Sequence, residues 1–138
     1  MVEQVDQYRN YQTVDIVRDV VKMPQVYERM NITPQQLQAF CQQWQIQELA
    51  VFGSILRDDF RQHGANPSDV DLLFRHLPKT NMSLLRRVKM KTELEALCHR
   101  PVDLVMISEV MASHNPNRKK HILESARLLY VQGSRLSD

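Results

Sequence analysis

The sequence has little cysteine, no long apolar run and almost no net charge. Cys41 and Cys98 are its only cysteines, and they stand alone, without the spacing of a metal site or of a disulfide framework. This usage fits a reducing compartment, so we expect the protein in the cytoplasm. No apolar run approaches membrane-spanning length, and the first residues do not resemble a signal peptide. We therefore expect no contact with a membrane.

Neither sign of charge dominates the composition. The 18 basic residues nearly balance the 16 acidic ones, which leaves a net charge of +2. Nucleic-acid-binding domains usually carry a marked basic excess, so we expect no direct binding to nucleic acid. Apolar residues make up 43% of the 138 positions and charged residues 25%, which is typical of one globular domain.

The first thirty residues are the least regular part of the chain. Thr13 could begin a helix that carries several valines and ends at Pro24, although the valines fit a strand nearly as well. We therefore assign residues 1–30 to an N-terminal extension that packs on the domain or contacts a partner. Residues 31–138 form the domain itself.

Helix signals are clearer in the domain. Thr33 followed by Pro34 predicts a helix start, and apolar residues follow at helical spacing as far as Trp44. A second helix is expected near Ser83, with Met90, Leu94 and Leu97 buried. Its solvated side would hold Arg86, Arg87, Lys89 and Lys91. The same basic run could also steer a nucleotide or an acidic partner.

A last helix is expected from about Arg118 to Val131, burying Ile122, Ala126 and Leu129. The basic residues at its start, from Arg118 to His121, are unfavourably placed for the helix dipole. An external anion would compensate for that arrangement.

A short apolar run from Leu49 to Phe52 ends at Gly53 and Ser54. The run is too short for a helix and contains β-branched and aromatic residues, so it predicts a buried strand. Gly53 allows a tight turn, and the backbone amides after Ser54 could bind a phosphate at a helix start. The same pair also fits a plain turn in which Ser54 caps a helix. Arg57, which follows, could bind a triphosphate or pair with a neighbouring aspartate.

Two aspartates one residue apart, Asp69 and Asp71, open a second apolar run. In a strand they would point to one side while Val70 and Leu72 point to the core. Adjacent carboxylates repel unless a cation lies between them, and Mg²⁺ usually takes one or two protein carboxylates. The pair also fits a simpler explanation without a metal ion, in which Asp69 is a turn residue and Asp71 is solvated at the edge of a sheet.

A third aspartate favours the metal site over the simpler explanation. Asp103 is the single charge near the start of another short apolar run, from Val102 to Ile107. Charged residues are rarely buried without a partner. If the two strands are neighbours, Asp103 completes an acidic cluster, where it could bind a metal ion or accept a proton.

This combination of Gly53 and Ser54, Asp69 and Asp71, and the strand with Asp103 resembles the minimal nucleotidyltransferases (MNT) of the DNA polymerase β superfamily. The likeness is closest to the small MNT antitoxins paired with HEPN toxins, and it covers about residues 31–138. One departure is that fourteen residues separate Ser54 from Asp69, several more than is usual in the family. A longer loop costs little stability, but it could alter how the serine and the aspartates converge.

The resemblance implies an α/β fold of the polymerase β-like nucleotidyltransferase type, a small mixed sheet flanked by helices. It implies transfer of AMP from ATP to a hydroxyl, such as a tyrosine of a HEPN ribonuclease toxin, in a type VII-like toxin–antitoxin pair. Asp69, Asp71 and Asp103 would be catalytic and bind Mg²⁺, while Gly53, Ser54 and Arg57 would bind the nucleotide. The alternatives are an inactive antitoxin of the same fold that neutralises its partner by binding, and a small-molecule transferase, for whose usual second domain the chain has no room.

Overall fold

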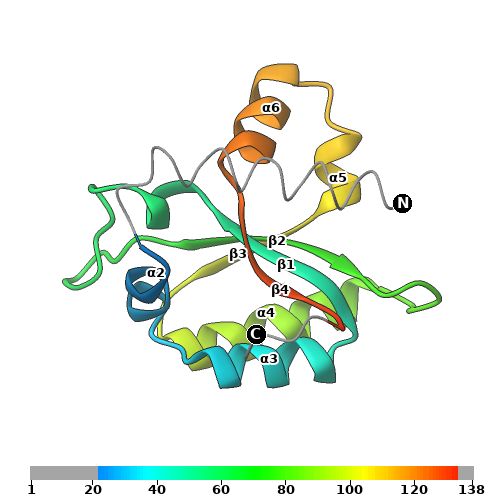
Figure 1. Cartoon of the computed structure of the whole chain (residues 1–138), viewed down its shortest axis with the longest axis horizontal. Coiled ribbons are helices and arrows are strands. Elements are labelled where there is room, and N and C mark those ends of the chain that lie inside the picture. Colours follow the sequence, from blue (N-terminus) through cyan, green and yellow to red (C-terminus); the bar gives the residue numbers. More distant parts are fainter. Residues whose placement is uncertain (1–21, 134–138) are drawn as a thin grey trace.

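The centre of the structure is a sheet of four strands in the order β3-β2-β1-β4, seen in the computed structural model, which describes residues 22–133 (Figure 1). β1 pairs antiparallel with both β2 and β4, and β2 pairs parallel with β3. The sheet is therefore mixed, as expected from the sequence. The strands are β1 (Ile46–Phe52), β2 (Val70–His76), β3 (Val102–Met106) and β4 (Arg127–Val131).

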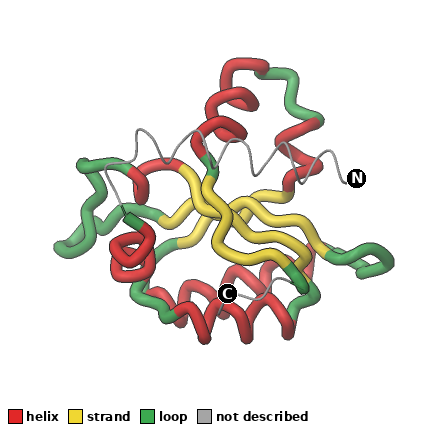
Figure 2. Tube along the Cα trace, in the orientation of Figure 1, coloured by secondary structure: helices red, strands yellow, loops and turns green. Residues whose placement is uncertain are grey.

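Helices cover both faces of this sheet (Figures 1 and 2). On one face lie α3 (Pro34–Gln43) and α4 (Leu84–Cys98), with α2 (Met23–Met30) beside them. On the other face lie α5 (Ile107–Met111) and α6 (Pro116–Ser125). The second face is covered by less helix, since α5 has only five residues.

The apolar residues of the strands alternate between the two faces, so the core has two parts. Leu49 and Val51 of β1 belong to a larger cluster with α2, α3 and α4, and Ala50 and Phe52 belong to a smaller one with α5 and α6. This alternation is the side-chain period of a strand buried on both faces. It identifies the face on which each residue of β2 and β3 lies.

The helix starts predicted at Thr33 and Ser83 are confirmed. The Thr33 hydroxyl accepts a hydrogen bond from the amide of Gln36 (3.1 Å), and the Gln36 side chain accepts one from the amide of Thr33 (2.9 Å). Ser83 caps α4 in the same way through the amide of Arg86 (3.1 Å). Both caps satisfy amides that a helix leaves unpaired at its start.

The prediction of a last helix from Arg118 to Val131 is wrong in its second half. α6 ends at Ser125, and the next residues form the edge strand β4. Ile122 and Ala126 are buried in the smaller cluster, whereas Leu129 is buried in the larger one. These residues contact opposite faces of the sheet, which the single buried face of one helix would not do.

The prediction that Arg86 and Arg87 belong to a solvated face of α4 is also wrong. Arg86 donates to the carbonyl of Trp44 (3.0 Å), and Arg87 donates to the carbonyl of Leu104 (2.8 Å) and to the carboxylate of Glu109 (2.7 and 3.0 Å). The exposed residues of α4 include Leu84, Leu85 and Val88 as well as Lys89 and Lys91. Met90 and Leu94 are fully buried, as expected, while Leu97 is partly buried.

Most of the helix expected between Thr13 and Pro24 lies outside the described residues. Pro24 itself lies in the first turn of α2, where proline is tolerated because the amides of that turn have no partner within the helix. Val26 and Met30 of α2 are completely buried in the larger cluster. The part of residues 1–30 that the structure describes therefore packs into the core. Within residues 22–133, no helix is long and apolar enough to span a membrane.

Candidate functional site

Gly53 forms a sharp corner at the end of β1. It begins a single turn of 3-10 helix, η1 (Gly53–Leu56), and its φ of 80° lies in the left-handed region that favours glycine. A Cβ atom at this position would collide with the Oδ2 atom of Asp71. Only glycine therefore lets the backbone of the corner come this close to the carboxylate. The expected helix after Ser54 is no longer than this turn, so its dipole contributes little.

The three predicted aspartates lie around this corner. Asp71 on β2 pairs with Phe52 of β1 on one side and with Asp103 of β3 on the other. Because β2 and β3 are parallel and in register here, Asp71 and Asp103 lie on the same face of the sheet. Asp69 comes one residue before β2. The structure therefore brings together, from separate parts of the chain, the carboxylates that the sequence predicted.

These carboxylates lie where the helices stop covering the sheet. Leu73, two residues after Asp71 and on the same face, is buried in the smaller cluster under α5 and α6. Asp71 is partly buried, whereas Asp69 and Asp103 are exposed. The acidic group is thus accessible from solvent at the uncovered end of this face.

The environment of Asp71 makes its charge unfavourable. Burial, followed by the charges of Asp103 and Asp69, raises the pKa of Asp71 from 3.8 to about 6, against the opposing effects of Arg57 and Arg118. Like charges that share a site disfavour ionisation, and a cation between them removes this penalty. The site therefore favours a bound cation at neutral pH.

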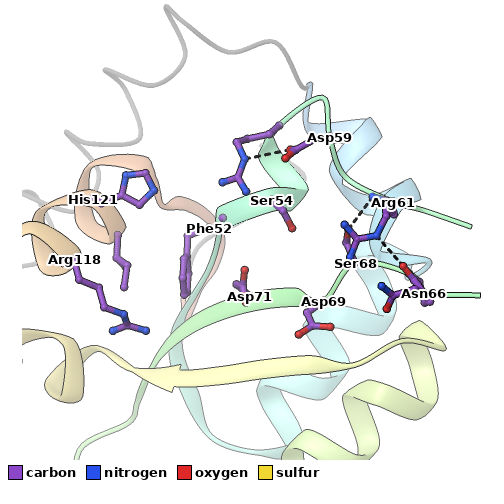
Figure 3. Close-up of a pocket in the computed structure, with 14 residues that line it drawn as sticks. Phe52, Ser54, Asp59, Arg61, Asn66, Ser68, Asp69, Asp71, Arg118 and His121 are labelled. Atoms are coloured by element: carbon purple, nitrogen blue, oxygen red, sulfur yellow. Dashed lines mark hydrogen bonds and ion pairs between the residues drawn. The ribbon is translucent and has the colours of Figure 1, made fainter.

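A cleft of about 620 Å³ opens beside the corner (Figure 3). Figure 3 shows Asp71 at its centre, with Arg118 and His121 of α6 on one side and Arg61 and Asn66 on the other. A cleft of this size is within the range of small-molecule sites. Three guanidinium groups line it together with the aspartates, which suits a ligand that carries both anionic groups and a metal ion. The lining residues are Phe52, Gly53, Ser54, Arg57, Asp59, Arg61, Asn66, Pro67, Ser68, Asp69, Asp71, Arg118, His121 and Ile122.

Five of the six site residues predicted from the sequence line this cleft, and the sixth lies next to it. Gly53, Ser54, Arg57, Asp69 and Asp71 are part of the lining, while Asp103 is outside it on the neighbouring strand.

The position of Arg57 fits both roles expected from the sequence, binding a triphosphate and pairing with an aspartate. It lines the cleft and also pairs with Asp59, its Nε lying 3.2 Å from Oδ1. More than half of each of these two side chains is exposed. Such a surface pair is weak, so an anionic ligand can replace Asp59 as the partner of Arg57.

The long segment between Ser54 and Asp69 forms one wall of the cleft. The amide of Arg61 donates to the hydroxyl of Ser68 (2.8 Å), and the amide of Ser68 donates to the carbonyl of Arg61 (2.8 Å). This double bridge closes the tip of the segment into a loop. The insertion therefore borders the site and leaves the cleft open.

Several lining residues were not predicted as site residues. Arg61, Asn66 and Ser68 belong to the irregular loop, where the sequence has no periodicity to indicate which side chains point inward. Arg118 and His121 belong to the basic helix start, for which the sequence did suggest an external anion. Lys119 and Lys120, from the same run, are not part of the lining.

The donor set fits a hard metal ion with few protein ligands. Among residues 22–133, no group of three or more His, Cys, Asp or Glu side chains is arranged to hold a metal ion. Mg²⁺ usually binds through only one or two protein carboxylates and completes its coordination with water and phosphate oxygens. Asp69 and Asp71, which both line the cleft, supply such a pair, with Asp103 beside them.

Known proteins of one family are similar to this chain. A family model described as a nucleotidyltransferase domain matches residues 34–129. A solved toxin–antitoxin structure with AMP-PNP is similar at 14% identity over 74% of this chain and 76% of that chain, with a TM-score of 0.52. A minimal nucleotidyltransferase is 25% identical over 67% of this chain and 85% of that chain, with a TM-score of 0.47. No curated protein matches the chain.

One further similar structure contains a tri-AMPylated HEPN toxin from Shewanella oneidensis in complex with its MNT antitoxin. The identity is 15% over 71% of this chain and 69% of that chain, with a TM-score of 0.49.

Replacing Gly53 with alanine tests the contact between the corner and Asp71. Gly53→Ala is expected to weaken binding of Mg²⁺ and AMP-PNP by about tenfold or more, because the new methyl group displaces the Asp71 carboxylate. Isothermal titration calorimetry measures this affinity.

Gly133→Ala is the matched control for this variant. Gly133 has a similar φ of 83°, but a Cβ there meets no atom within 4 Å. Both variants should lose about 1–2 kcal/mol of stability from backbone strain. Equal nucleotide affinities in the two variants would contradict the proposed contact.

The raised pKa of Asp71 predicts a stability change with pH in the metal-free protein. Because the folded-state pKa of about 6 exceeds the ordinary 3.8, the stability from this group is present below pH 3.8 and lost as pH rises through 6. Asp71→Asn should therefore raise the melting temperature at pH 8 in EDTA by roughly 3 °C or more. Below pH 4 the variant and the wild type should melt together.

The control for this measurement is Asp58→Asn, which changes an exposed carboxylate outside the cleft. It should not change the melting temperature at pH 8. A wild type as stable as Asp71→Asn at pH 8 would contradict the pKa of Asp71 raised by burial and by the neighbouring carboxylates.

Proposed function

Since this chain belongs to the nucleotidyltransferase domain family, whose model covers residues 34–129, we propose that it transfers AMP from ATP to a hydroxyl group of a partner protein. The observation that carries this proposal is the position of Asp71, which lies between the Gly53 corner and Asp103 and lines a cleft with Asp69. A triphosphate in that cleft would meet guanidinium groups from two sides.

The arginines of the cleft are suited to hold the phosphates. Arg57 and Arg61 come from the loop wall and Arg118 from α6. Figure 3 shows Arg61 and Arg118 on opposite sides of Asp71, so positive charge would reach the ligand from both sides. Guanidinium groups bind phosphate oxygens with paired hydrogen bonds. This placement would hold the triphosphate over Asp69 and Asp71 and limit its orientation.

The acidic residues have different roles in the proposed reaction. Bound by Asp69 and Asp71, Mg²⁺ would supply charge neutralisation for the phosphates and the leaving pyrophosphate. Asp103 would accept the proton of the acceptor hydroxyl. The hydroxyl oxygen then forms a bond to the α-phosphorus, and the bond from that phosphorus to the bridging oxygen breaks, so that pyrophosphate leaves. Positioning and electrostatic stabilisation supply most of the acceleration in such transfers.

The proposed acceptor is a tyrosine hydroxyl of a HEPN-type toxin, for which this chain is the antitoxin. Two observations support this partner. The motif from Gly53 to Asp103 resembles that of MNT antitoxins, and a toxin–antitoxin structure with AMP-PNP has a similar fold. We place the pair in the cytoplasm because Cys41 and Cys98 are both free.

A second candidate is an antitoxin that neutralises its partner by binding alone. The position of Asp103 outside the lining of the cleft favours it. The two candidates differ in what they require of the aspartates, since contact with a partner does not need a metal site.

The test is transfer of labelled AMP to the co-expressed toxin. Wild-type protein with Mg²⁺ and ATP labelled at the α-phosphate should add adenylate to the toxin, detected by label and by intact mass. Asp69→Asn/Asp71→Asn should reduce the rate by about 100-fold or more, because it removes the metal ligands.

Asp58→Asn, which alters an exposed carboxylate outside the cleft, should keep the wild-type rate. No adenylate with the wild-type protein would contradict the proposed activity. Toxin neutralisation that survives the double substitution would establish the binding-only candidate.

A further inference from the structure

Phe60 lies in a segment, residues 57–69, that forms neither helix nor strand but lines the cleft. The residue is only 8% exposed. Two guanidinium groups lie over the ring, that of Arg29 at 5.4 Å and that of Arg100 at 4.9 Å from its centroid. Arg29 belongs to α2, and Arg100 comes just before β3. We refer to Arg29, Phe60 and Arg100 as the Phe60 clamp.

Arg29 holds the first part of the loop wall. Its Nη1 atom donates to the carbonyl of Ile55 (2.9 Å) and to the carbonyl of Arg57 (2.6 Å). These contacts fix the backbone on which Arg57 stands. α2 lies outside the residues matched by the family model, so this support comes from a part of the chain that the family model does not include.

Arg100 holds the other end of the same wall. Its Nη1 atom donates to the carbonyls of Ser68 (3.0 Å) and Arg61 (3.3 Å), and its Nη2 atom donates to that of Gln62 (2.6 Å). Arg100 is itself buried. It ties the loop to the strand that carries Asp103, three residues further along the chain.

The loop carries the cleft residues Arg57, Arg61 and Asn66 on one folded unit. The Arg61 side chain donates to the carbonyl of Asn66 (2.8 Å), which adds a bond within the loop. Ordering a flexible loop at the moment of binding would cost conformational entropy. A loop already held by the hydrogen bonds of Arg29 and Arg100 avoids most of that cost.

From these contacts we propose that Arg29 and Arg100 are positioning residues, which hold the loop so that Arg57 and Arg61 meet the β- and γ-phosphates of the nucleotide. This inference rests on the function proposed above and adds a determinant of triphosphate binding to it. The longer loop and the helix before the matched residues then act together, since the loop supplies Phe60 and the helix supplies Arg29, one of the two arginines that contact its ring.

Lysine substitutions separate the geometry of the clamp from its charge. A guanidinium group is planar, donates several hydrogen bonds in fixed directions and stacks on an aromatic ring, whereas an ammonium group is a compact point charge. Arg100→Lys and Arg29→Lys therefore keep the net charge of the protein but lose the fork of hydrogen bonds to the loop.

Arg86 provides a matched control, because it makes the same kinds of contact away from the cleft. Its Nη2 atom donates to the carbonyl of Trp44 (3.0 Å), and its guanidinium lies 5.1 Å from the centroid of the Trp44 ring. None of these partners lines the cleft. Arg86→Lys should lower stability in the same way without affecting the loop.

The experiment compares the affinities of AMP-PNP and AMP for the wild type and the three lysine variants by isothermal titration calorimetry with Mg²⁺. In Arg100→Lys and Arg29→Lys, AMP-PNP should bind about tenfold more weakly and AMP less than about threefold more weakly, because AMP lacks the outer phosphates. Arg86→Lys should keep both affinities, although its melting temperature falls by a similar amount. Hydrogen exchange of residues 57–69 should increase only in the two clamp variants.

The outcomes distinguish the two proposals. If the wild type binds neither nucleotide, the proposed function fails and this inference with it. If the wild type binds AMP-PNP and the clamp variants bind it equally well, only the positioning role is overturned. Equal losses for AMP-PNP and AMP, or the same loss in Arg86→Lys, would also overturn it, because a general loss of stability would then explain the result.

Discussion

The close approach of the Gly53 backbone to the Asp71 carboxylate is the constraint on which the rest of the site depends. Burial, together with the charges of Asp103, its partner on β3, and of Asp69, raises the pKa of Asp71 to about 6. A protein gains no stability by placing like charges together, so this arrangement has to be maintained by the fold and relieved by a ligand. In the proposed function, a divalent cation bound between these carboxylates would remove that repulsion.

The topology produces this crowding from distant parts of the chain. The antiparallel pairing of β1 with β2 places Asp71 opposite the end of β1, and the parallel pairing of β2 with β3 adds Asp103. α5 and α6 cover only part of that face, which leaves the carboxylates open to a cleft. The Phe60 clamp then fixes the loop that brings positive charge to the same place. Sheet, helices and loop thus each supply one requirement of the site that we propose for a metal-bound nucleotide.

The sequence predicted the acidic residues because strand alternation and family motif pointed to the same positions, Asp69, Asp71 and Asp103. It could not predict Arg61 or Arg29, because their partners are backbone carbonyls or loop residues without periodicity. The last helix was predicted too long because a short apolar run such as that from Leu128 to Val131 fits a helix or a strand equally well. Only the pairing with β1 decides it. The roles of Arg86 and Arg87 were missed because tertiary contacts, not local pattern, decide whether an arginine is solvated.

The most direct test is a crystal structure of the protein with AMP-PNP and with Mn²⁺ in place of Mg²⁺, in which anomalous scattering locates the metal ion. We expect an anomalous peak within about 2.3 Å of carboxylate oxygens of both Asp69 and Asp71, with the phosphates between it and the arginines of the loop and α6. A peak elsewhere on the protein, or a nucleotide bound outside the cleft beside Gly53, would contradict the claim that these carboxylates form the metal site.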